Sequence, residues 1–565
     1  MKKVKLLSVL LLSVMVGCGS NVTSSSSSTN TNSVNSSILS SNSSSSSITI
    51  NNSLSININE KEDDYYIYEG LKFIELDDGF SLATYDKKEV QANIVLPSSI
   101  NNKKLISIED DAFLNCKKLE SIELPNTIKR IGNNAFSGCE NLSEVNIPSY
   151  LESLGDYAFL NCKLITKLVL PESLVDIGNY AFANCYTLNS VNIPSSLTSI
   201  SDGMFYSCYK VESFVIPSGV TKIGEYAFSH CESITSIELP SVLLTLGKEA
   251  FSNCYKLKEF VVPDGITNVG YGALAKCNSL LKLTMPFIGS SLEGNAHFGY
   301  IFGARTYLNN SGNIPYYLAE VTLTKETKID DYAFYSCNYI KKVNLPDSIS
   351  YIGKYAFFSC DGMVSINIPN SVKEIGDYAF SICSRLESIV IPSSVDRIGD
   401  YTFSNCRDLK SVTLPSCIKS FGENVFSFCE SLKDIELASD LETISFEAFY
   451  KCISLEYITI PSKVSVISEN AFSECTSLKS IVIPSNVKEI SKRAFALCSS
   501  LSSVVISGEV DFIDDYAFSY CTKASIFIEG DEIPSTWSSK WNSSRRPVYL
   551  SGEWEYVDGV PTPIK

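Results

Sequence analysis

Cysteine is the residue type whose spacing in this chain first points to chemistry. Seventeen of the nineteen cysteines recur at one constant spacing, which equals the spacing from Cys360 to Cys383. They form two series, which we call ladders, from Cys116 to Cys277 and from Cys337 to Cys521. Such a row could form disulfides in an exported chain, or it could fill one apolar slot of a repeated fold. An odd number of thiols in one buried row cannot all pair, so we expect buried free thiols. Cys417 lies outside the ladders, and we expect it to be exposed and the one reactive cysteine.

Other residues that could support catalysis or bind a metal are few. His230 and His297 are the only histidines, and no HExxH, GxSxG, P-loop or CxxC motif occurs. We expect His230 to face solvent. Acidic pairs such as Asp330-Asp331 lie at the start of the helical turns predicted below, where capping explains them. We therefore expect no catalytic residue, no metal site, no cofactor and no small-molecule substrate.

The length and net charge of the chain restrict which architectures and which partners are expected. The chain has 565 residues, more than one hydrophobic core usually serves, so several domains or a repeat array are expected. Its formal net charge is -17 at pH 7. Because an acidic protein repels phosphate backbones, nucleic acid is a poor choice of partner.

Residues 375–397, IGDYAFSICSRLESIVIPSSVDR, illustrate one period of the pattern. Apolar residues on both sides of Cys383 are spaced by three and four, which predicts a short α or 3₁₀ turn. Residues 389–391 alternate as in a strand, and a proline ends that strand. Asp377 is placed to cap the helical turn, and Gly399 allows a tight bend. Each coil should therefore hold a strand, a second extended piece and a helical turn.

The other periods repeat these features. Phenylalanine precedes the ladder cysteine by three positions in sixteen of the seventeen copies. The motif L-x-x-I-x-I-P-x-x-V-x-x-I-G-x-x-A-F-x-x-C resembles the BspA-like leucine-rich repeats of bacterial surface proteins, over roughly residues 64 to 545. The resemblance implies an α/β repeat solenoid: a curved leucine-rich-repeat array with one stacked parallel β-sheet and short helical turns.

The N-terminal segment, MKKVKLLSVLLLSVMVGCGS, predicts export. Residues 1–17 have the lysines and short apolar run of a signal peptide, and the VMVGC sequence resembles a bacterial lipobox. The resemblance implies cleavage before Cys18 and acylation of its thiol; an ordinary cleaved signal is the alternative. Residues 18–63 are rich in Ser and Asn and are expected to form a disordered tether. The chain should thus be lipid-anchored on the outer face of a bacterial membrane, at the cell surface.

The remaining boundaries follow from where the repeat begins and ends. Residues 64–97 lack the cysteine pattern and should form an N-terminal cap, with a hairpin turn at Asp77-Asp78-Gly79. Residues 98–530 form the solenoid, and residues 531–565 a C-terminal cap and tail. Within the tail, the tryptophans Trp537 and Trp541 could bind sugars, but they are better suited to cover the last coil.

An insertion at residues 287–320 interrupts the ladders. It is rich in glycine and aromatic residues, and long insertions in solenoids often lie on the binding face. We take Phe298, Tyr300, Phe302 and Tyr307 as candidate protein-binding residues. The alternative is that the insertion is a structural flap packed against the coils.

The residue seven positions after each ladder cysteine should point outward from the strand, and we call these positions the outer row. The row holds no Lys or Arg and is mildly apolar and weakly acidic, which suits extended contact with a protein. Its valines are further candidate protein-binding residues: Val169, Val215, Val261, Val390 and Val482.

These features predict a surface protein that binds other macromolecules and performs no reaction. The family resemblance implies adhesion to extracellular proteins, either host matrix or cell-surface proteins or those of neighbouring cells. A non-adhesive envelope scaffold is the main alternative. An enzyme with a site assembled from distant coils is the least favoured class.

Overall fold

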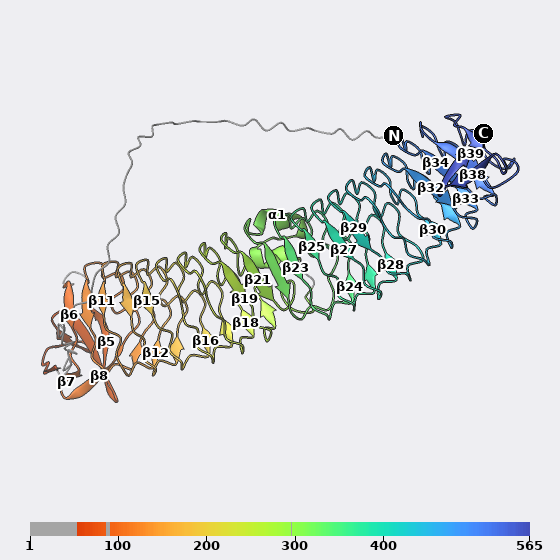
Figure 1. Ribbon diagram of the computed structural model, residues 1–565. Coiled ribbons are helices and arrows are strands. Elements are labelled where there is room, and N and C mark those ends of the chain that lie inside the picture. The colour runs from red at the N-terminus through yellow and green to blue at the C-terminus, as the bar shows by residue number, and fades with distance from the viewer. Residues whose placement is uncertain (1–53, 86–90, 295–296, 565) are drawn as a thin grey trace, which may run out of the picture. The chain divides into compact units, whose positions relative to one another are not determined.

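The computed structural model describes residues 54–85, 91–294 and 297–564. The predicted signal peptide, Cys18 and most of the predicted tether lie outside these residues. The unit from Asn52 onward is a solenoid whose coils stack one upon the next (Figure 1). Among the described residues, no helix has the length and apolar character needed to cross a bilayer.

Two ladders of short parallel strands run along the solenoid, where one stacked sheet was expected. Neighbouring strands pair one period apart, as in Ser388↔Ser411 of the first ladder and Glu374↔Arg397 of the second. The first ladder carries the outer row and comprises β6 (Asn93–Val95), β9 (Ser121–Glu123), β11 (Glu144–Val145), β13 (Lys167–Leu168), β15 (Ser190–Val191), β19 (Glu259–Val261), β21 (Lys282–Met285), β22 (Glu320–Leu323), β23 (Lys342–Asn344), β25 (Ser365–Ile366), β27 (Ser388–Val390), β29 (Ser411–Thr413), β32 (Ser480–Ile483), β34 (Ser503–Ile506), β36 (Ser525–Ile528) and β37 (Val548–Tyr549).

The second ladder lies on the other extended piece of each coil, just before the position that Gly399 occupies in the repeat. It comprises β8 (Lys103–Ile108), β10 (Arg130–Ile131), β12 (Ser153–Leu154), β14 (Asp176–Ile177), β16 (Ser199–Ile200), β17 (Lys222–Ile223), β18 (Thr245–Leu246), β20 (Asn268–Val269), β24 (Tyr351–Ile352), β26 (Glu374–Ile375), β28 (Arg397–Ile398), β30 (Thr443–Ile444), β31 (Val466–Ile467), β33 (Glu489–Ile490) and β35 (Phe512–Ile513).

The expected helical turn before each cysteine is wrong. This segment, from the fifth position before the cysteine to the cysteine itself, is a run of β-turns that we call the Phe–Cys turn. Tyr378 and Ile382 both have positive φ, 57° and 62°, which no helix accommodates. The N–H of Cys383 bonds within the turn to Phe380 O at 3.2 Å, but the N–H of Phe380 bonds to Thr402 O of the next coil at 2.9 Å. Alternate N–H groups therefore join neighbouring coils.

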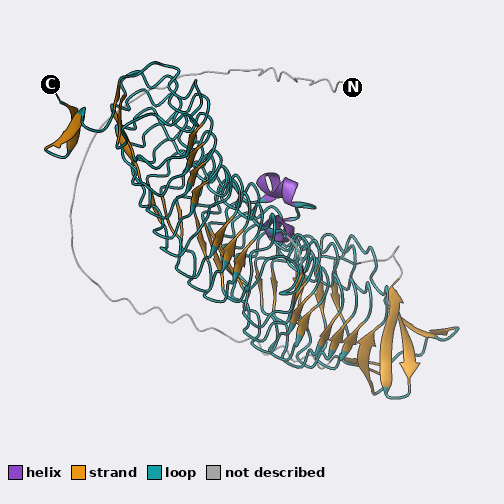
Figure 2. Ribbon diagram, turned by 90° about the vertical axis from the view of Figure 1, so that its right-hand side faces the viewer, coloured by secondary structure: helices purple, strands orange, loops and turns teal. Residues whose placement is uncertain are grey.

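Helices in the described part of the chain are confined to the insertion. They are η1 (Phe298–Phe302), η2 (Tyr307–Asn309) and α1 (Asn310–Asn313), which stand off one side of the solenoid (Figure 2). The α/β description thus holds for the parallel strands and fails for the turns.

Where an aspartate stands just before a Phe–Cys turn, it connects two coils instead of capping its own turn. Oδ1 of Asp377 accepts the N–H of Asp400 at 3.1 Å, and Oδ1 of Asp400 accepts the N–H of Glu423 at 2.9 Å. Asp331 accepts the N–H of Lys354 in the same way, at 2.7 Å. Gly399 is required by this contact: a Cβ there would lie 2.5 Å from the backbone nitrogen of Asp377.

Across the described coils, the core holds two stacks of phenylalanine rings, separated at Leu274 and flanked by the ladder thiols. Phe357 and Phe380, for example, have ring centroids 5.2 Å apart and planes 3° apart. All seventeen ladder cysteines are buried thiols that are not in disulfides, which confirms the expected thiol row, and Cys417 is exposed as expected. The thiol of Cys383 donates to Phe357 O at 3.2 Å, and the N–H of Cys360 donates to that same oxygen at 3.2 Å. A thiol in this slot therefore supplies the second donor that the carbonyl needs.

Both ends of the described array are closed by other elements. The hairpin expected at Asp77-Asp78-Gly79 is present, between β4 (Leu71–Leu76) and β5 (Gly79–Tyr85), and β5 pairs with β8 of the second ladder. At the other end Nε1 of Trp537 donates to Val510 O at 2.9 Å, and the Trp541 ring packs edge-on against Phe518. Both tryptophans are buried, as expected of residues that cover the last coil.

The remaining strands belong to these ends. β1 (Ser55–Ile56) pairs with β7 (Ser99–Ile100), and β2 (Lys61–Glu62) and β3 (Tyr65–Tyr68) extend the N-terminal hairpin. At the C-terminal end, β38 (Trp554–Val557) and β39 (Val560–Pro563) form an antiparallel hairpin.

Burial of the thiols predicts a loss of stability in alkali. Burial raises the pKa of the Cys406 thiol from its ordinary value of 9.0 to about 12. The unfolded chain releases the Cys406 proton at a lower pH than the folded chain does. The free energy of unfolding should therefore stay constant below pH 9.0 and fall between pH 9.0 and about pH 12, by about 1.4 kcal/mol per pH unit for each such thiol. Urea unfolding across this range should show a shallower decline for Cys406→Ala than for the parent. Cys417→Ala, which changes an exposed thiol, is the control, and equal slopes for all three proteins would contradict the prediction.

Candidate protein-binding surface

The outer row is a line of exposed side chains along the first ladder. Val215 is 84% exposed, and Val169, Val261, Val390 and Val482 are each at least 55% exposed. Their strand neighbours point inward and are buried, because successive strand residues face opposite sides. The row ends before Val505, which is buried. The structure thus places all five candidate valines on one accessible line.

Closure of the row at its C-terminal end comes from aromatic packing. Phe527 is aligned with Val505 in the next coil and is itself buried. Its ring centroid lies 5.4 Å from that of Trp554, whose Nε1 donates to Ile528 O at 3.2 Å. The C-terminal hairpin therefore limits the accessible part of the row to the coils before it.

Some members of the outer row serve the scaffold. The side chain of Asn146 exchanges two hydrogen bonds, both 2.7 Å, with the backbone of Leu124 in the previous coil. Asn192 makes the same pair of bonds with Leu170 at 2.8 Å. These amides join coils where the strands are short, and they are less available to a partner than the valines.

The insertion belongs to one enlarged coil. Thr284 pairs with Thr322, and these two residues are separated along the chain by much more than one repeat. The next pair in the ladder, Thr322 with Asn344, is separated by nearly the ordinary length of one repeat. Within this coil Phe298 stacks on Phe334, with ring centroids 4.8 Å apart, and so begins the second phenylalanine stack. Phe302 packs against Phe298, and both rings are buried. For these two candidates the structural alternative holds, because a buried ring cannot meet a partner.

The other two candidate aromatics of the insertion are half-buried. Tyr307 stacks on Tyr332 at 4.3 Å and so begins a second stack of tyrosines; a first one joins Tyr157 and Tyr180, which like Tyr332 lie five positions before a ladder cysteine. The second stack continues from Tyr332 to Tyr355 at 5.1 Å. Tyr300 packs edge-on against Tyr271 at 5.5 Å. Both side chains mainly replace contacts that an ordinary coil would make.

The exposed aromatic surface of the insertion lies elsewhere. Tyr316 and Tyr317 are 65% and 61% exposed, and the Tyr316 ring lies 4.7 Å from that of Tyr339. We call these three residues the tyrosine patch. Tyr317 lies shortly before β22, so the patch borders the first ladder, where Leu281 is also exposed. Sequence reasoning did not select these residues; their one signal was a tyrosine pair between Pro315 and a predicted strand.

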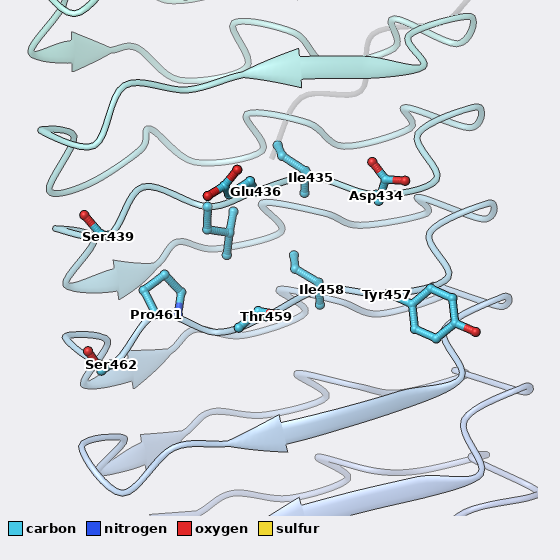
Figure 3. Close-up of a pocket in the computed structure, with 10 residues that line it drawn as sticks. Asp434, Ile435, Glu436, Ser439, Tyr457, Ile458, Thr459, Pro461 and Ser462 are labelled. Carbon is cyan, nitrogen blue, oxygen red and sulfur yellow. The ribbon is translucent and has the colours of Figure 1, made fainter. Parts of the chain in front are cut away.

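A hollow opens along the first ladder between β29 and β32 (Figure 3). Its volume is about 580 Å³, and its lining comes from two neighbouring coils. In the part of the chain that the structure describes, no backbone hydrogen bond joins residues 434–437 to residues 457–460, although β30 and β31 of the same coils remain paired. The lining residues are Asp434, Ile435, Glu436, Leu437, Ser439, Tyr457, Ile458, Thr459, Pro461 and Ser462.

The two histidines are both half-buried. His230, expected to face solvent, is half-buried against Tyr206, and this burial lowers its pKa. Nδ1 of His297 lies 2.8 Å from Oδ1 of Asn310, and burial lowers the pKa of His297 as well. Within residues 54–85, 91–294 and 297–564, no group of three His, Cys, Asp or Glu side chains could hold a metal ion.

Comparison with known proteins identifies the repeat. The model of the BspA type leucine rich repeat region matches residues 91–212, 198–300, 316–429 and 397–525. Solved structures that match include a leucine-rich repeat protein from Bacteroides ovatus, with 24% identity, a TM-score of 0.42, and coverage of 66% of this chain and 94% of that one. A leucine rich cell surface protein from Faecalibacterium prausnitzii has 24% identity, a TM-score of 0.31, and coverage of 79% and 95%. No curated protein matches the chain.

The different roles of the insertion tyrosines can be separated by stability measurements. Tyr307→Ala should lower the free energy of unfolding by about 2 kcal/mol, because it removes a half-buried ring stacked on Tyr332. Tyr316→Ala should change it by less than about 0.5 kcal/mol, because that ring is mostly exposed. Denaturant unfolding followed by circular dichroism provides both values. An equal loss in the two variants would show that the tyrosine patch is part of the core packing.

Proposed function

Because the chain belongs to the BspA-type leucine-rich repeat family, we propose that it is a surface protein that binds other macromolecules, as an adhesin for host or neighbouring-cell proteins. The observation that carries this proposal is the outer row with the adjoining tyrosine patch. Together they form an exposed surface with apolar and aromatic side chains that the fold does not use. A large exposed apolar surface beside polar residues is typical of a protein interaction site.

The composition of this surface supports a protein partner. Tyrosine is enriched in protein interfaces, where a few residues usually supply most of the binding energy. The outer row adds contact length with the valines from Val169 to Val482. We assign no reaction to the chain, and in this proposal the partner is an extracellular protein. If the chain binds no cell or matrix component, a scaffold role in the envelope replaces the adhesin.

We place the protein at the cell surface through a lipid on Cys18, which precedes the described residues. The support is the lipobox-like sequence before Cys18. Cys18→Ser should release the protein from membranes or leave it unprocessed, as measured by detergent-phase partitioning of cell fractions. A mutant that partitions like the parent would show that the anchor assignment is wrong.

Binding to a panel of extracellular matrix proteins, measured by surface plasmon resonance, tests the adhesin proposal. Replacing Tyr316 and Tyr317 together by Ser should weaken binding about tenfold or more, since both rings are exposed anchors. Val215→Lys should weaken it less, about threefold, if contact is spread along the row. Deleting the insertion is unsuitable, because Phe298 and Tyr307 belong to the core and the stacked tyrosines.

A matched control comes from two exposed tyrosines outside the surface. Tyr150 and Tyr520 are 67% and 66% exposed, and the double change to Ser should leave binding within about twofold of the parent. Equal loss in the two double variants would remove the tyrosine patch from the binding surface. Absence of binding by the parent to every matrix protein and to intact cells would reject the adhesin.

A further inference from the structure

We propose that the hollow between β29 and β32 binds a cationic side chain, arginine or lysine, carried on an extended segment of a protein partner. This inference rests on the proposed function and names the chemistry of the partner at one place on the surface. Figure 3 shows Asp434 and Glu436 on one coil, and Tyr457 and Thr459 on the next. The volume of about 580 Å³ is within the range of ordinary ligand pockets.

The carboxylates of the hollow are left without cations of their own. Asp434 and Glu436 are exposed, and neither forms an ion pair among the described residues. Nearby acids differ: Asp440 pairs with Lys463, and Glu456 pairs with Lys479. The lining itself contains no lysine or arginine. The hollow therefore offers two negative charges to a positive group from outside.

The floor and one wall suit the apolar part of such a side chain. Ile435 and Ile458 are buried beneath the opening and supply an apolar floor for methylene groups. Tyr457 is 54% exposed, and its ring already interacts with a cation, because Nζ of Lys479 lies 4.9 Å from its centroid. A guanidinium can contact an aromatic ring and a carboxylate together, so arginine fits better than a small ion.

The backbone of the same two coils favours a peptide over a free cation. Among the described strands, first-ladder pairing stops at β29 and resumes at β32, so both coils that line the hollow lie in an unpaired stretch, as do coils elsewhere in this ladder, for example between β25 and β27. Residues 434–437 and 457–460 make no backbone hydrogen bonds with each other within the described residues. Their free N–H and C=O groups are the kind that an extended peptide uses when it adds to a sheet. The net charge of -17 would also draw a basic segment toward the protein.

The test is calorimetric titration of the full chain with a blocked peptide of alternating arginine and threonine, and with a glutamate–threonine peptide as ligand control. The double variant Asp434→Asn, Glu436→Gln should bind the arginine peptide at least about tenfold more weakly than the parent. Tyr457→Ser should bind it several-fold more weakly, whereas Tyr457→Phe, which keeps the ring, should bind it nearly as the parent does.

A control of equal charge separates the hollow from general attraction. Asp396 and Glu442 are exposed, unpaired in the described residues, and lie beside the second ladder. The double variant Asp396→Asn, Glu442→Gln should bind within about twofold of the parent. An equal loss in the two double variants, or no binding of the arginine peptide by the parent, would overturn the inference. If the inference about the hollow is overturned but the parent still binds matrix proteins, the adhesin proposal is unaffected. If the parent binds the arginine peptide as expected but binds no cell or matrix component, the inference about the hollow is supported and the adhesin proposal is rejected.

Discussion

Each coil of this solenoid relies on the next for backbone hydrogen bonds that it cannot make itself. In the Phe–Cys turn the left-handed residues Tyr378 and Ile382 aim alternate N–H groups along the solenoid, toward the following coil. A coil in isolation would leave those groups unpaired, and a buried unpaired N–H costs about as much as a lost hydrogen bond. The constant spacing of the repeat is thus held by the backbone. The stacked rings, the thiol bonds and the aspartate contacts all depend on that register.

This dependence explains why the insertion resembles an ordinary coil in its interior. It must supply a ring for the phenylalanine stack, which Phe298 does, and a ring for the tyrosine stack, which Tyr307 does. It must also accept a neighbouring N–H, and Ile301 O accepts that of Leu274 at 2.8 Å. Residues that meet none of these needs are free to face solvent. Tyr316 and Tyr317 are such residues, so the exposed aromatic surface is what the scaffold leaves unused.

Periodicity predicted the repeat, the buried thiols and the direction of the outer row, because these follow from which positions recur. The prediction of helical turns from this periodicity was wrong. Apolar residues three and four positions apart lie on one face of a helix, but they also lie on one face of successive β-turns that are separated by residues in the left-handed conformation. Periodicity could not assign roles inside the insertion, where Phe298 and Tyr316 are both simply aromatic residues without a register. The hollow was also beyond sequence reasoning: Ala438 stands where most coils have the proline that ends the strand, but this one change does not locate a hollow, and other first-ladder coils in the described residues lack backbone pairing as well.

The row of buried thiols has a consequence for the export that we propose, because it constrains how the chain reaches its folded state. A chain that crosses a membrane unfolded presents its ladder cysteines to extracellular oxidants before any coil has closed. A disulfide formed at that moment would join two slots that each need a thiol hydrogen bonded to a carbonyl, as Cys383 is to Phe357. Stacking must therefore outpace oxidation, and each coil that docks removes one more cysteine from the reach of the oxidant. The order in which the coils dock along the chain is then also the order in which their cysteines become protected from oxidation.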